Sequence, residues 1–282
     1  MNEVRELDSS FYPRINELVS KAFGYQPPNS FFDDFPIWNT KIANHLGYIE
    51  EGELMSHAGI RFAEMKTASG RVPIALIGAV ATQAEYRGHG MSTALMRAAI
   101  DRCEQKGAHW AFLWGSEHEF YRKFGFELSG IQGRASIRNL SQVTAQSSPQ
   151  VLKGLTETIF HHLSTLPNGI ALNMADRAWF FAHKNVKWYY LEKPFAFVAF
   201  ERGMDLPHLV HEWGGDSQGL KIILSHVLAN DEEASLLGRT ADLRQLGFEP
   251  EFIIEESLCL AKPIQPNLKW NPEFWISGLS AC

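Results

Sequence analysis

The hydrophobic and polar positions of the chain change period near residue 80, where a strand pattern passes into a helix pattern. The run Ile74–Val80 is almost wholly apolar and follows Pro73, which predicts a buried strand. After two glycines the apolar residues recur at helical spacing and predict an amphipathic helix that ends at Gly107. The apolar face of this helix consists of Met91, Leu95, Ala98, Ala99 and Cys103.

Similar patterns predict further elements on either side of this strand and helix. Helical periodicity covers residues 11–23, two strands are expected within residues 47–64, and an apolar strand is expected at residues 108–114. A short helix follows and stops at Gly125, a residue suited to the left-handed conformation at a helix end. The predicted order is helix, three strands, helix, strand, helix and strand, ending near Leu140.

A polar segment then separates this unit from a second one. Residues 141–149 have neither a helical nor a strand period, which predicts a linker. We therefore expect one domain at residues 1–140 and another at residues 141–282. The strands expected in the second domain are 187–191, 195–201, 206–213 and 234–238, and a helix is expected at 217–228.

The second domain is predicted to be a degenerate copy of the first. Leu246-Gly247-Phe248 matches Phe124-Gly125-Phe126, although two α/β patterns can also agree by chance. The glycine turn of the second domain is followed by Asp216, and no arginine stands where the first domain has Arg87. Because a carboxylate repels a phosphate group, we expect this domain to be structural or to shape the substrate cleft.

Length, charge and cysteine content narrow the class of protein. With 282 residues, 45% of them apolar, the chain can form two ordinary hydrophobic cores. The three cysteines have neither metal-ligand spacing nor the pattern of a disulfide framework, so no metal is expected. Neither a signal peptide nor an apolar run of about 18 residues is evident, and we expect a soluble, cytoplasmic protein with no membrane partner. A formal net charge of −6 without a basic cluster argues against nucleic acid as a partner.

The segment between the predicted strand and helix, Arg87-Gly88-His89-Gly90, has the features of a phosphate-binding turn. Backbone N–H groups at the start of a helix converge on one point, where the positive end of the helix dipole also lies. Gly88 and Gly90 allow the ligand to approach the backbone closely, and Arg87 adds donors for phosphate oxygens.

Three other interpretations of this segment remain open at this point. A P-loop requires Gly-Lys-Ser/Thr, and no lysine lies between Lys66 and Lys106. A dinucleotide-binding fingerprint requires a third glycine where Thr93 stands. An ordinary strand-to-helix turn also fits, since Gly-x-Gly alone is a weak signal.

Two motifs favour a fourth interpretation, because they occur in the order in which one enzyme family has them. Arg87-x-x-Gly90-x-Ser92 resembles the Arg/Gln-x-x-Gly-x-Gly/Ala acetyl-CoA loop of the GNAT N-acetyltransferases, and Tyr121-x-x-x-Gly125-Phe126 resembles their second motif, Tyr-x-x-x-Gly-Phe. Residues 114–117, taken together with the motif around Tyr121, are most similar to the tandem-GNAT branch that includes the enhanced-intracellular-survival type acetyltransferases. Those proteins have a further sterol-carrier-like domain that this chain is too short to hold. The resemblance implies an α/β GNAT fold, with a mixed and mostly antiparallel sheet flanked by helices, followed by a second, degenerate GNAT-like domain.

The resemblance also implies that the chain binds acetyl-CoA as an acyl donor. The loop and first helical turn would hold the pyrophosphate, and the end of the strand would pair with the pantetheine arm and direct one N–H at the thioester oxygen. The expected binding residues are Val80, Ala81, Thr82, Arg87, Gly88, His89, Gly90, Met91, Ser92 and Ser116. Ser92 replaces the family's Gly or Ala, and its hydroxyl is expected to remain able to donate to a phosphate. His89 is equally compatible with an exposed position.

Two side chains are candidates for proton transfer. Tyr121 is the proposed general acid, because a phenol of pKa about 10 is protonated at pH 7 and can protonate a thiolate; packing beside Phe120 and Phe124 is the alternative. An amine of pKa about 10.4 must lose a proton before it attacks. Glu117 is the first candidate for this base, and a purely helix-capping role is the alternative. His45 and His57 are expected to be internally hydrogen-bonded histidines rather than bases.

The segment Tyr25–Asn39 is expected to border the acceptor cleft. Aromatic residues flank Asp33 and Asp34 there and would suit an amine, whereas a packed surface loop is the alternative. The apolar C-terminal residues 275–282 are expected to be buried. The predicted function is an acetyl-CoA-dependent N-acetyltransferase in which a primary amine of a small molecule, peptide or protein attacks directly in a ternary complex. A non-catalytic acyl-CoA-binding or sensing module and a transferase with another acyl donor are the alternatives.

Overall fold

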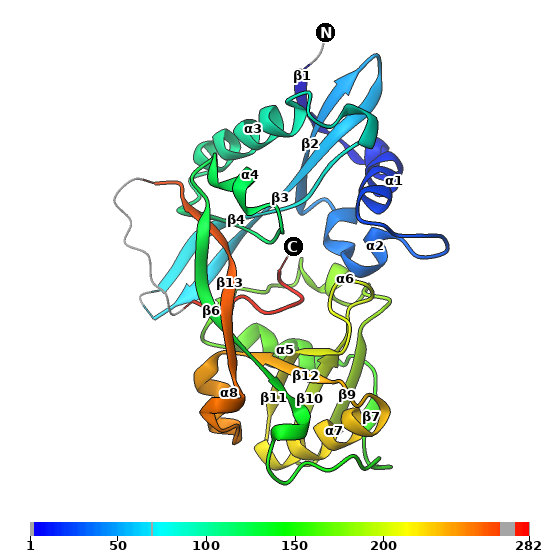
Figure 1. Cartoon of the computed structure of the whole chain (residues 1–282), viewed down its shortest axis with the longest axis vertical. Helices are drawn as coiled ribbons and strands as arrows, with labels where there is room; N and C mark the ends of the chain where they lie inside the picture. The colour runs from blue at the N-terminus through cyan, green and yellow to red at the C-terminus, as the bar shows by residue number, and fades with distance from the viewer. Residues whose placement is uncertain (1–2, 69, 266–273, 282) are drawn as a thin grey trace.

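The computed structural model describes residues 3–68, 70–265 and 274–281, which form a mixed α/β structure around one continuous sheet (Figure 1). The strand order is β1-β2-β3-β4-β5-β13-β6-β12-β11-β10-β9-β7, and β8 pairs with β3. The strands are β1 Glu3–Leu7, β2 Ala43–Glu50, β3 Glu53–Thr67, β4 Gly70–Thr82, β5 Trp110–Leu113, β6 Glu127–Ser136, β7 Leu152–Lys153, β8 Gly169–Ile170, β9 Lys187–Glu192, β10 Phe195–Phe200, β11 Leu209–Gly215, β12 Ser235–Gly238 and β13 Ile254–Pro263. The helices are α1 Tyr12–Ala22, α2 Phe31–Asp34, α3 Met91–Gln105, α4 His118–Arg122, α5 Glu157–Thr165, α6 Arg177–Phe180, α7 Ser217–Asn230 and α8 Thr240–Leu246.

The two halves of the sheet repeat one topology and exchange their last strands. In the first half, β4 pairs antiparallel with β3 and parallel with β5. In the second half, β11 correspondingly pairs antiparallel with β10 and parallel with β12. Strand β13, from near the end of the chain, is inserted between β5 and β6, while β6 of the first half pairs with β12 of the second. Figure 1 shows β6 and β13 as the long strands that run between the two halves. This exchange makes the sheet continuous.

Most elements predicted from the sequence are present. The expected helices at residues 11–23 and 91–107 correspond to α1 and α3, and the expected strands of the second half correspond to β9, β10, β11 and β12. The φ angles of Gly125 and Gly247 are 81° and 115°, the left-handed geometry predicted for Gly125 and repeated in the matched motif. The sequence pattern did not predict the short strands β1, β7 and β8, nor the insertion of β13 beside β5.

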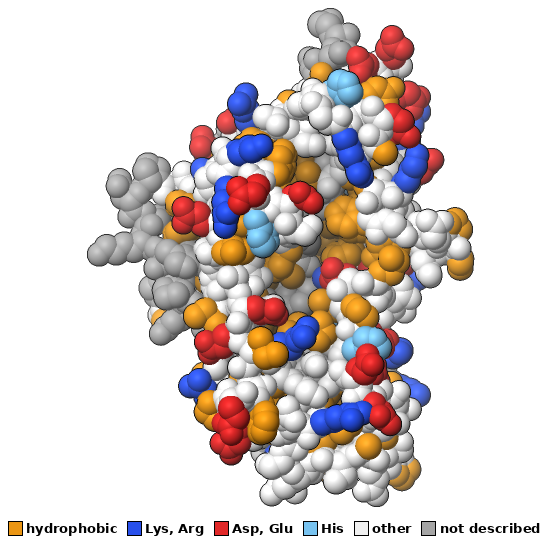
Figure 2. Space-filling view, viewed as in Figure 1, with side chains coloured by type: hydrophobic (Ala, Val, Ile, Leu, Met, Phe, Trp, Pro, Cys, Tyr) orange, Lys and Arg blue, Asp and Glu red, His pale blue; other side chains and the backbone are white. Residues whose placement is uncertain are grey.

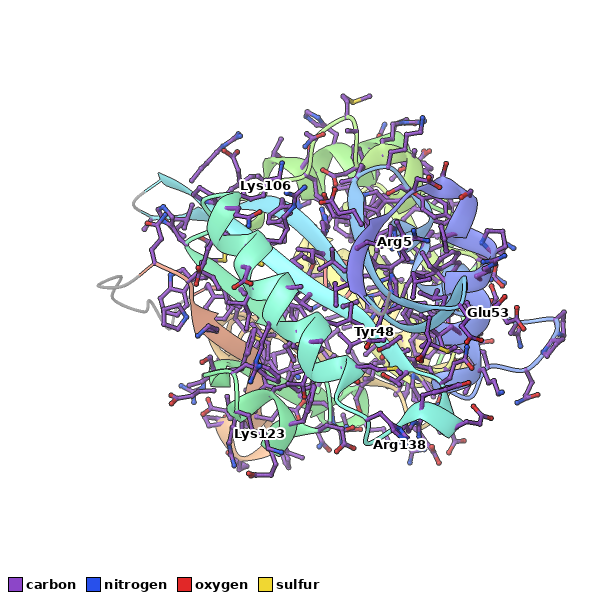
Figure 3. The ribbon with its side chains drawn as sticks, turned by 90° about the horizontal axis from the view of Figure 1, so that it is seen from above. Arg5, Tyr48, Glu53, Lys106, Lys123 and Arg138 are labelled. Atoms are coloured by element: carbon purple, nitrogen blue, oxygen red, sulfur yellow. The ribbon has the colours of Figure 1, made fainter. Side chains whose placement is uncertain are left out.

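A bulge in β4 exchanges the two faces of this strand. Before the bulge, Ala75 and Ile77 pack under α3, and after it, Ala79 and Ala81 pack with α1. Figure 1 shows α3 and α1 on opposite sides of these strands, and Figure 3 shows α3 from above with Lys106 labelled beyond its C-terminal end. In a regular strand all four side chains would share one face. The register of β3 and β4 shifts by one residue here, and the φ angle of Ala79 is 51°.

A buried ion pair joins the two halves. Arg61 of β3 donates through Nη2 to Asp176 Oδ1 over 2.9 Å, and the two side chains are 2% and 5% exposed. Asp176 also accepts a hydrogen bond of 3.0 Å from Trp179 Nε1, and the Arg61 guanidinium lies 4.8 Å from the centre of that indole. Because Asp176 directly precedes α6, this group fixes α6 of the second half against β3 of the first.

The described residues include two free cysteines, both buried. Burial raises the pKa of Cys103 to about 12 and raises that of Cys259 further, so both thiols are protonated at neutral pH. Cys282 lies outside the described residues. Across the described ranges, none of the helices combines the length and the apolar character needed to cross a membrane.

Candidate active site

A cavity of about 930 Å³ lies beside the ends of β4 and β5, and both halves of the chain line it. The two strands pair only as far as Ile77 and Leu113, and the cavity opens beyond this point. One wall is formed by the end of β4, the start of α3 and the loop before α4. The opposite wall comes from α2, the second half and residues 275–281. Figure 2 shows a hollow between the halves with hydrophobic side chains on its walls.

The predicted phosphate cradle lies at one end of this cavity. Gly88 and Gly90 both have a φ angle of 82°, and apart from their chain neighbours no described residue has an atom within 4 Å of the position that a Cβ atom would take. Helix α3 begins directly after Gly90, so its unpaired N–H groups start at the cavity wall. Arg87 Nε lies 3.5 Å from the carbonyl oxygen of Thr82. This arrangement offers backbone donors and a guanidinium to an anion.

All the predicted cofactor-binding residues except one line the cavity. His89 is exposed at the tip of the loop and is outside the set of lining residues. The exposed position of His89 agrees with the alternative, and a contact between His89 and a phosphate stays a prediction. The lining residues from the prediction are Val80, Ala81, Thr82, Arg87, Gly88, Gly90, Met91, Ser92 and Ser116.

A chain of three hydroxyl groups ties the start of α3 to the sheet. Ser56 donates to the carbonyl oxygen of Ala81 over 2.9 Å, and its Oγ lies 2.6 Å from Thr82 Oγ1, which lies 2.7 Å from Ser92 Oγ. Each hydroxyl has a single proton. Because Ser56 uses its proton in the hydrogen bond to the Ala81 carbonyl oxygen, Thr82 must donate to Ser56. Ser92 must in turn donate to Thr82. In this arrangement the Ser92 proton is used within the protein, so donation from Ser92 to a phosphate stays a prediction and requires its hydroxyl to turn away from Thr82.

Tyr121 lines the cavity from α4, next to the loop that follows β5. It is the buried residue of α4, and its ring packs at 5.1 Å from that of Phe120 and 6.4 Å from that of Phe126. A Cβ atom on Gly115 would lie 2.9 Å from the Tyr121 ring and 3.4 Å from its hydroxyl oxygen. Glycine at position 115 therefore makes room for the phenol beside the loop that follows β5.

The environment of Tyr121 keeps its hydroxyl protonated. Burial raises the pKa of Tyr121 to about 12, and the negative charge of Glu117 adds to the increase. The phenol is consequently a hydrogen-bond donor at any physiological pH, but a weaker acid than an ordinary tyrosine. This differs from the value of about 10 assumed from the sequence.

Three titratable residues, Glu117, His118 and Glu119, come shortly before Tyr121. Of these three, only Glu117 lines the cavity. It is exposed and occupies the N-cap position of α4, without a side-chain hydrogen bond to the helix. Glu119 instead forms an ion pair with Arg122 on the outer surface. Of the candidates for a base, Glu117 is thus the carboxylate that the fold brings to the cavity.

The expected acceptor segment contributes its aromatic rings but not its carboxylates. Phe31 and Phe35 line the cavity and stack on each other with centroids 4.4 Å apart. Asp34 points away from the cavity and accepts hydrogen bonds of 2.6 Å from Tyr25 and from Asn185. Asp33 binds Lys184 and the backbone N–H of Ser30. The expectation that these aspartates face an amine is therefore wrong, because other protein groups already use both.

The second half supplies cavity residues that the sequence did not predict. Arg202 is buried, and its guanidinium stacks 4.3 Å from the ring centre of Phe35 and forms an ion pair with Asp205. Arg202, Asp205, Leu206 and His211 all line the cavity. These residues are brought near the cradle only by the pairing of the two halves, so no local pattern indicates them.

Residues 275–281 form part of the same wall, and the buried side chains of Ile276 and Leu279 agree with the expectation for this segment, whose last residue, Cys282, lies outside the described residues. Arg202 donates to the carbonyl oxygens of Gly278 and Ala281. Glu212 accepts a hydrogen bond of 2.9 Å from the N–H of Leu279, and burial raises the pKa of this carboxyl group to about 7. Two buried side chains of the second half therefore hold the segment beside the cavity.

The glycine turn of the second half does not offer a phosphate site. Asp216 is the N-cap residue of α7, and its Oδ1 accepts the N–H of Gly219 over 2.9 Å. The carboxylate therefore occupies the start of α7 and satisfies one of its N–H groups, where the equivalent turn of the first half has no acidic side chain.

Comparison with known proteins agrees with this geometry. The family model described as an acetyltransferase (GNAT) domain matches residues 3–129. A comparison with curated protein sequences gave no significant match. The family match covers β1 to the start of β6, which includes the cradle and Tyr121.

Solved structures extend the similarity to the second half. A probable N-acyltransferase of Enterococcus faecalis is 15% identical with a TM-score of 0.66, covering 94% of this chain and 72% of that one. Eis1 of Mycobacterium abscessus is 17% identical with a TM-score of 0.63, covering 94% and 74%. A putative acetyltransferase of Pyrococcus horikoshii is 13% identical with a TM-score of 0.58, covering 99% and 95%. Residues 3–129 are therefore a GNAT acetyltransferase domain, in a chain whose fold throughout is that of the tandem GNAT proteins.

Proposed function

We propose that this protein is an acetyl-CoA-dependent N-acetyltransferase that acts on a primary amine. The observation that carries the proposal is one continuous cavity, which joins the cradle of Gly88 and Gly90 to Tyr121 and then to the stacked rings of Phe31 and Phe35. A donor held at the cradle would extend along the end of β4 toward Tyr121. An acceptor would approach from the aromatic wall, so both substrates would be present together.

In the proposed reaction the neutral amine nitrogen attacks the thioester carbon and the carbon–sulfur bond breaks. As the amide forms, this nitrogen loses its second proton to the departing thiolate, which leaves as the thiol of CoA. An N–H group at the end of β4, for which we propose that of Val80, would stabilise the oxyanion. Tyr121 would donate a hydrogen bond to the leaving sulfur. Full proton transfer from a phenol of pKa about 12 to a thiolate of conjugate-acid pKa about 8.5 is uphill by about 5 kcal/mol. A cationic acceptor beside Glu117 would offset its charge and thereby lower the pKa of Tyr121.

The attacking amine must first lose a proton. An alkylamine of pKa about 10.4 pays about 4–5 kcal/mol to be neutral at pH 7. We propose that Glu117 receives this proton, because it is the carboxylate at the cavity end of α4 and lies on the same wall as Tyr121. The amine would thus enter as an ammonium ion, pair with Glu117 and become neutral at the reacting carbon.

A transferase for a longer acyl group is the second candidate. The walls away from the cradle are largely apolar and include Leu206, Leu237 and Leu258. Such a surface would accept an acyl chain as readily as the apolar part of an amine.

The test combines a panel of acyl donors with a panel of primary amines. We expect release of free CoA thiol from acetyl-CoA and an acetylated product detected by mass. We also expect the Glu117→Gln variant to lose at least tenfold in rate at pH 7 and to regain most of it near pH 10, where the amine is already neutral. Glu119→Gln is the matched control and should equal the wild type. Binding without any product would indicate the non-catalytic module instead.

A further inference from the structure

Two buried histidines meet the bulge of β4 on the face away from α3. His57 Nδ1 lies 2.8 Å from the carbonyl oxygen of Ala79, and His57 Nε2 lies 2.9 Å from His45 Nδ1. Both side chains are almost completely buried, at 0% and 2% exposure. His45 Nε2 has no hydrogen-bond partner among the described residues. The chain of contacts therefore runs from His45 through His57 to the backbone of the candidate active site.

The direction of these hydrogen bonds follows from the carbonyl oxygen at their end. Ala79 O can only accept, so His57 must donate through Nδ1. In a neutral imidazole the other nitrogen then accepts, and His45 must donate through its own Nδ1. Burial lowers the pKa of His57 to about 3 and that of His45 to about 4, so both rings are neutral near pH 7.

Aromatic packing fixes the position of the two rings. The His45 ring lies 5.2 Å from that of Tyr12 and 6.2 Å from that of Trp38. The indole of Trp38 covers Gly59, where a Cβ atom would lie 2.4 Å from the ring. This contact is close to His57 on the same strand, and it leaves the imidazoles little freedom to move.

The contact with Ala79 determines the direction of one peptide group. In a trans peptide the C=O and the following N–H point in opposite directions. Since the Ala79 carbonyl points at His57, the N–H of Val80 points away from it, and both Ala79 and Val80 line the cavity. A non-glycine residue at a φ angle of 51° is strained and persists only where its surroundings hold it.

We propose that His57, itself oriented by His45, is a positioning residue for catalysis: it holds the Ala79–Val80 peptide so that the Val80 N–H faces the thioester carbonyl. This inference rests on the proposed acyl transfer from acetyl-CoA. The role is indirect, because neither imidazole is among the residues that line the cavity. Two histidines that perform no proton transfer would thus preorganise the oxyanion donor.

The first measurement is the infrared carbonyl band of acetyl-CoA labelled with carbon-13 at the thioester. In the wild type we expect this band to move to lower frequency on binding, because a hydrogen bond weakens the C=O bond. His57→Leu should lose most of the shift. His57→Asn should keep it, since the amide nitrogen of Asn takes nearly the place of the imidazole Nδ1. His226→Leu, a half-buried histidine of α7 beside Tyr189, is the control and should behave as the wild type.

The second measurement separates the inference from the function on which it rests. His57→Leu should lower kcat about tenfold or more, with the Kd for acetyl-CoA unchanged within twofold and with His57→Asn restoring most of the rate. If the wild type fails to bind acetyl-CoA, the proposed function is overturned. If it binds and turns over, but the band is unshifted or His57→Leu keeps both shift and rate, the function stands and the role of His57 is overturned.

Discussion

Replacing Tyr121 with phenylalanine is expected to lower kcat at least tenfold while leaving the affinity for acetyl-CoA almost unchanged. The substitution removes one hydroxyl and keeps the ring that packs against Phe120 and Phe126. The lost hydroxyl would act on the leaving sulfur, whose negative charge develops only as the bond breaks. Its loss therefore affects the transition state and not the bound donor.

The measurement is steady-state release of free thiol, with the Kd taken from calorimetry. Tyr48→Phe is the matched control, because Tyr48 packs against the same hydrophobic cluster but lies on β2 outside the cavity. An unchanged kcat in Tyr121→Phe would remove Tyr121 from the mechanism. A raised Kd with unchanged kcat would assign the hydroxyl to cofactor binding instead.

Replacing Asp176 with alanine is expected to reduce the free energy of unfolding by about 3–5 kcal/mol, the usual cost of leaving a buried charge without its partner. The side chain of Arg61 is 2% exposed. Its Nε and Nη1 atoms already have no hydrogen-bond partner among the described residues. Loss of Asp176 would therefore leave a buried cation without its counter-ion, against the Trp179 ring.

Chemical denaturation of the wild type and the variant measures this loss. The ion pair between Arg71 and Glu64 offers the control, because its side chains are 65% and 52% exposed and solvent screens their interaction. Glu64→Ala should cost at most about 1 kcal/mol. Equal losses in the two variants would show that the Arg61–Asp176 pair is not a buried electrostatic contact between the halves.

The sequence predicted the elements that depend on local pattern. The apolar run before Gly88 and the helical spacing after Gly90 depend only on neighbouring residues, and both elements are present. The motif around Tyr121 placed a glycine where a left-handed residue ends α4, and the φ angle of Gly125 agrees. The predicted mixed, mostly antiparallel sheet is also confirmed, since the described strand pairs are antiparallel except β4 with β5 and β11 with β12.

The features that the sequence did not predict depend on contacts distant in the chain. The bulge occurs at Ala79, and alanine carries no signal for a positive φ angle; His57, 22 residues away, holds its carbonyl. Arg202 reaches the cavity only because β6 and β13 join the two halves. The use of the Asp34 carboxylate by Tyr25 and Asn185 likewise requires the folded chain. Periodicity describes one element at a time, so it contains none of this information.

The proposed function depends most directly on whether the Arg87-Gly88-His89-Gly90 turn binds acetyl-CoA. The decisive measurement is calorimetric titration of the full chain with acetyl-CoA and, separately, with NADH, repeated on Arg87→Ala. We expect one site for acetyl-CoA, none for NADH and an affinity for acetyl-CoA at least tenfold weaker in the variant, since a guanidinium–phosphate contact is lost. Absence of acetyl-CoA binding in the wild type would contradict the proposed function, because the turn would then be structural or serve another ligand.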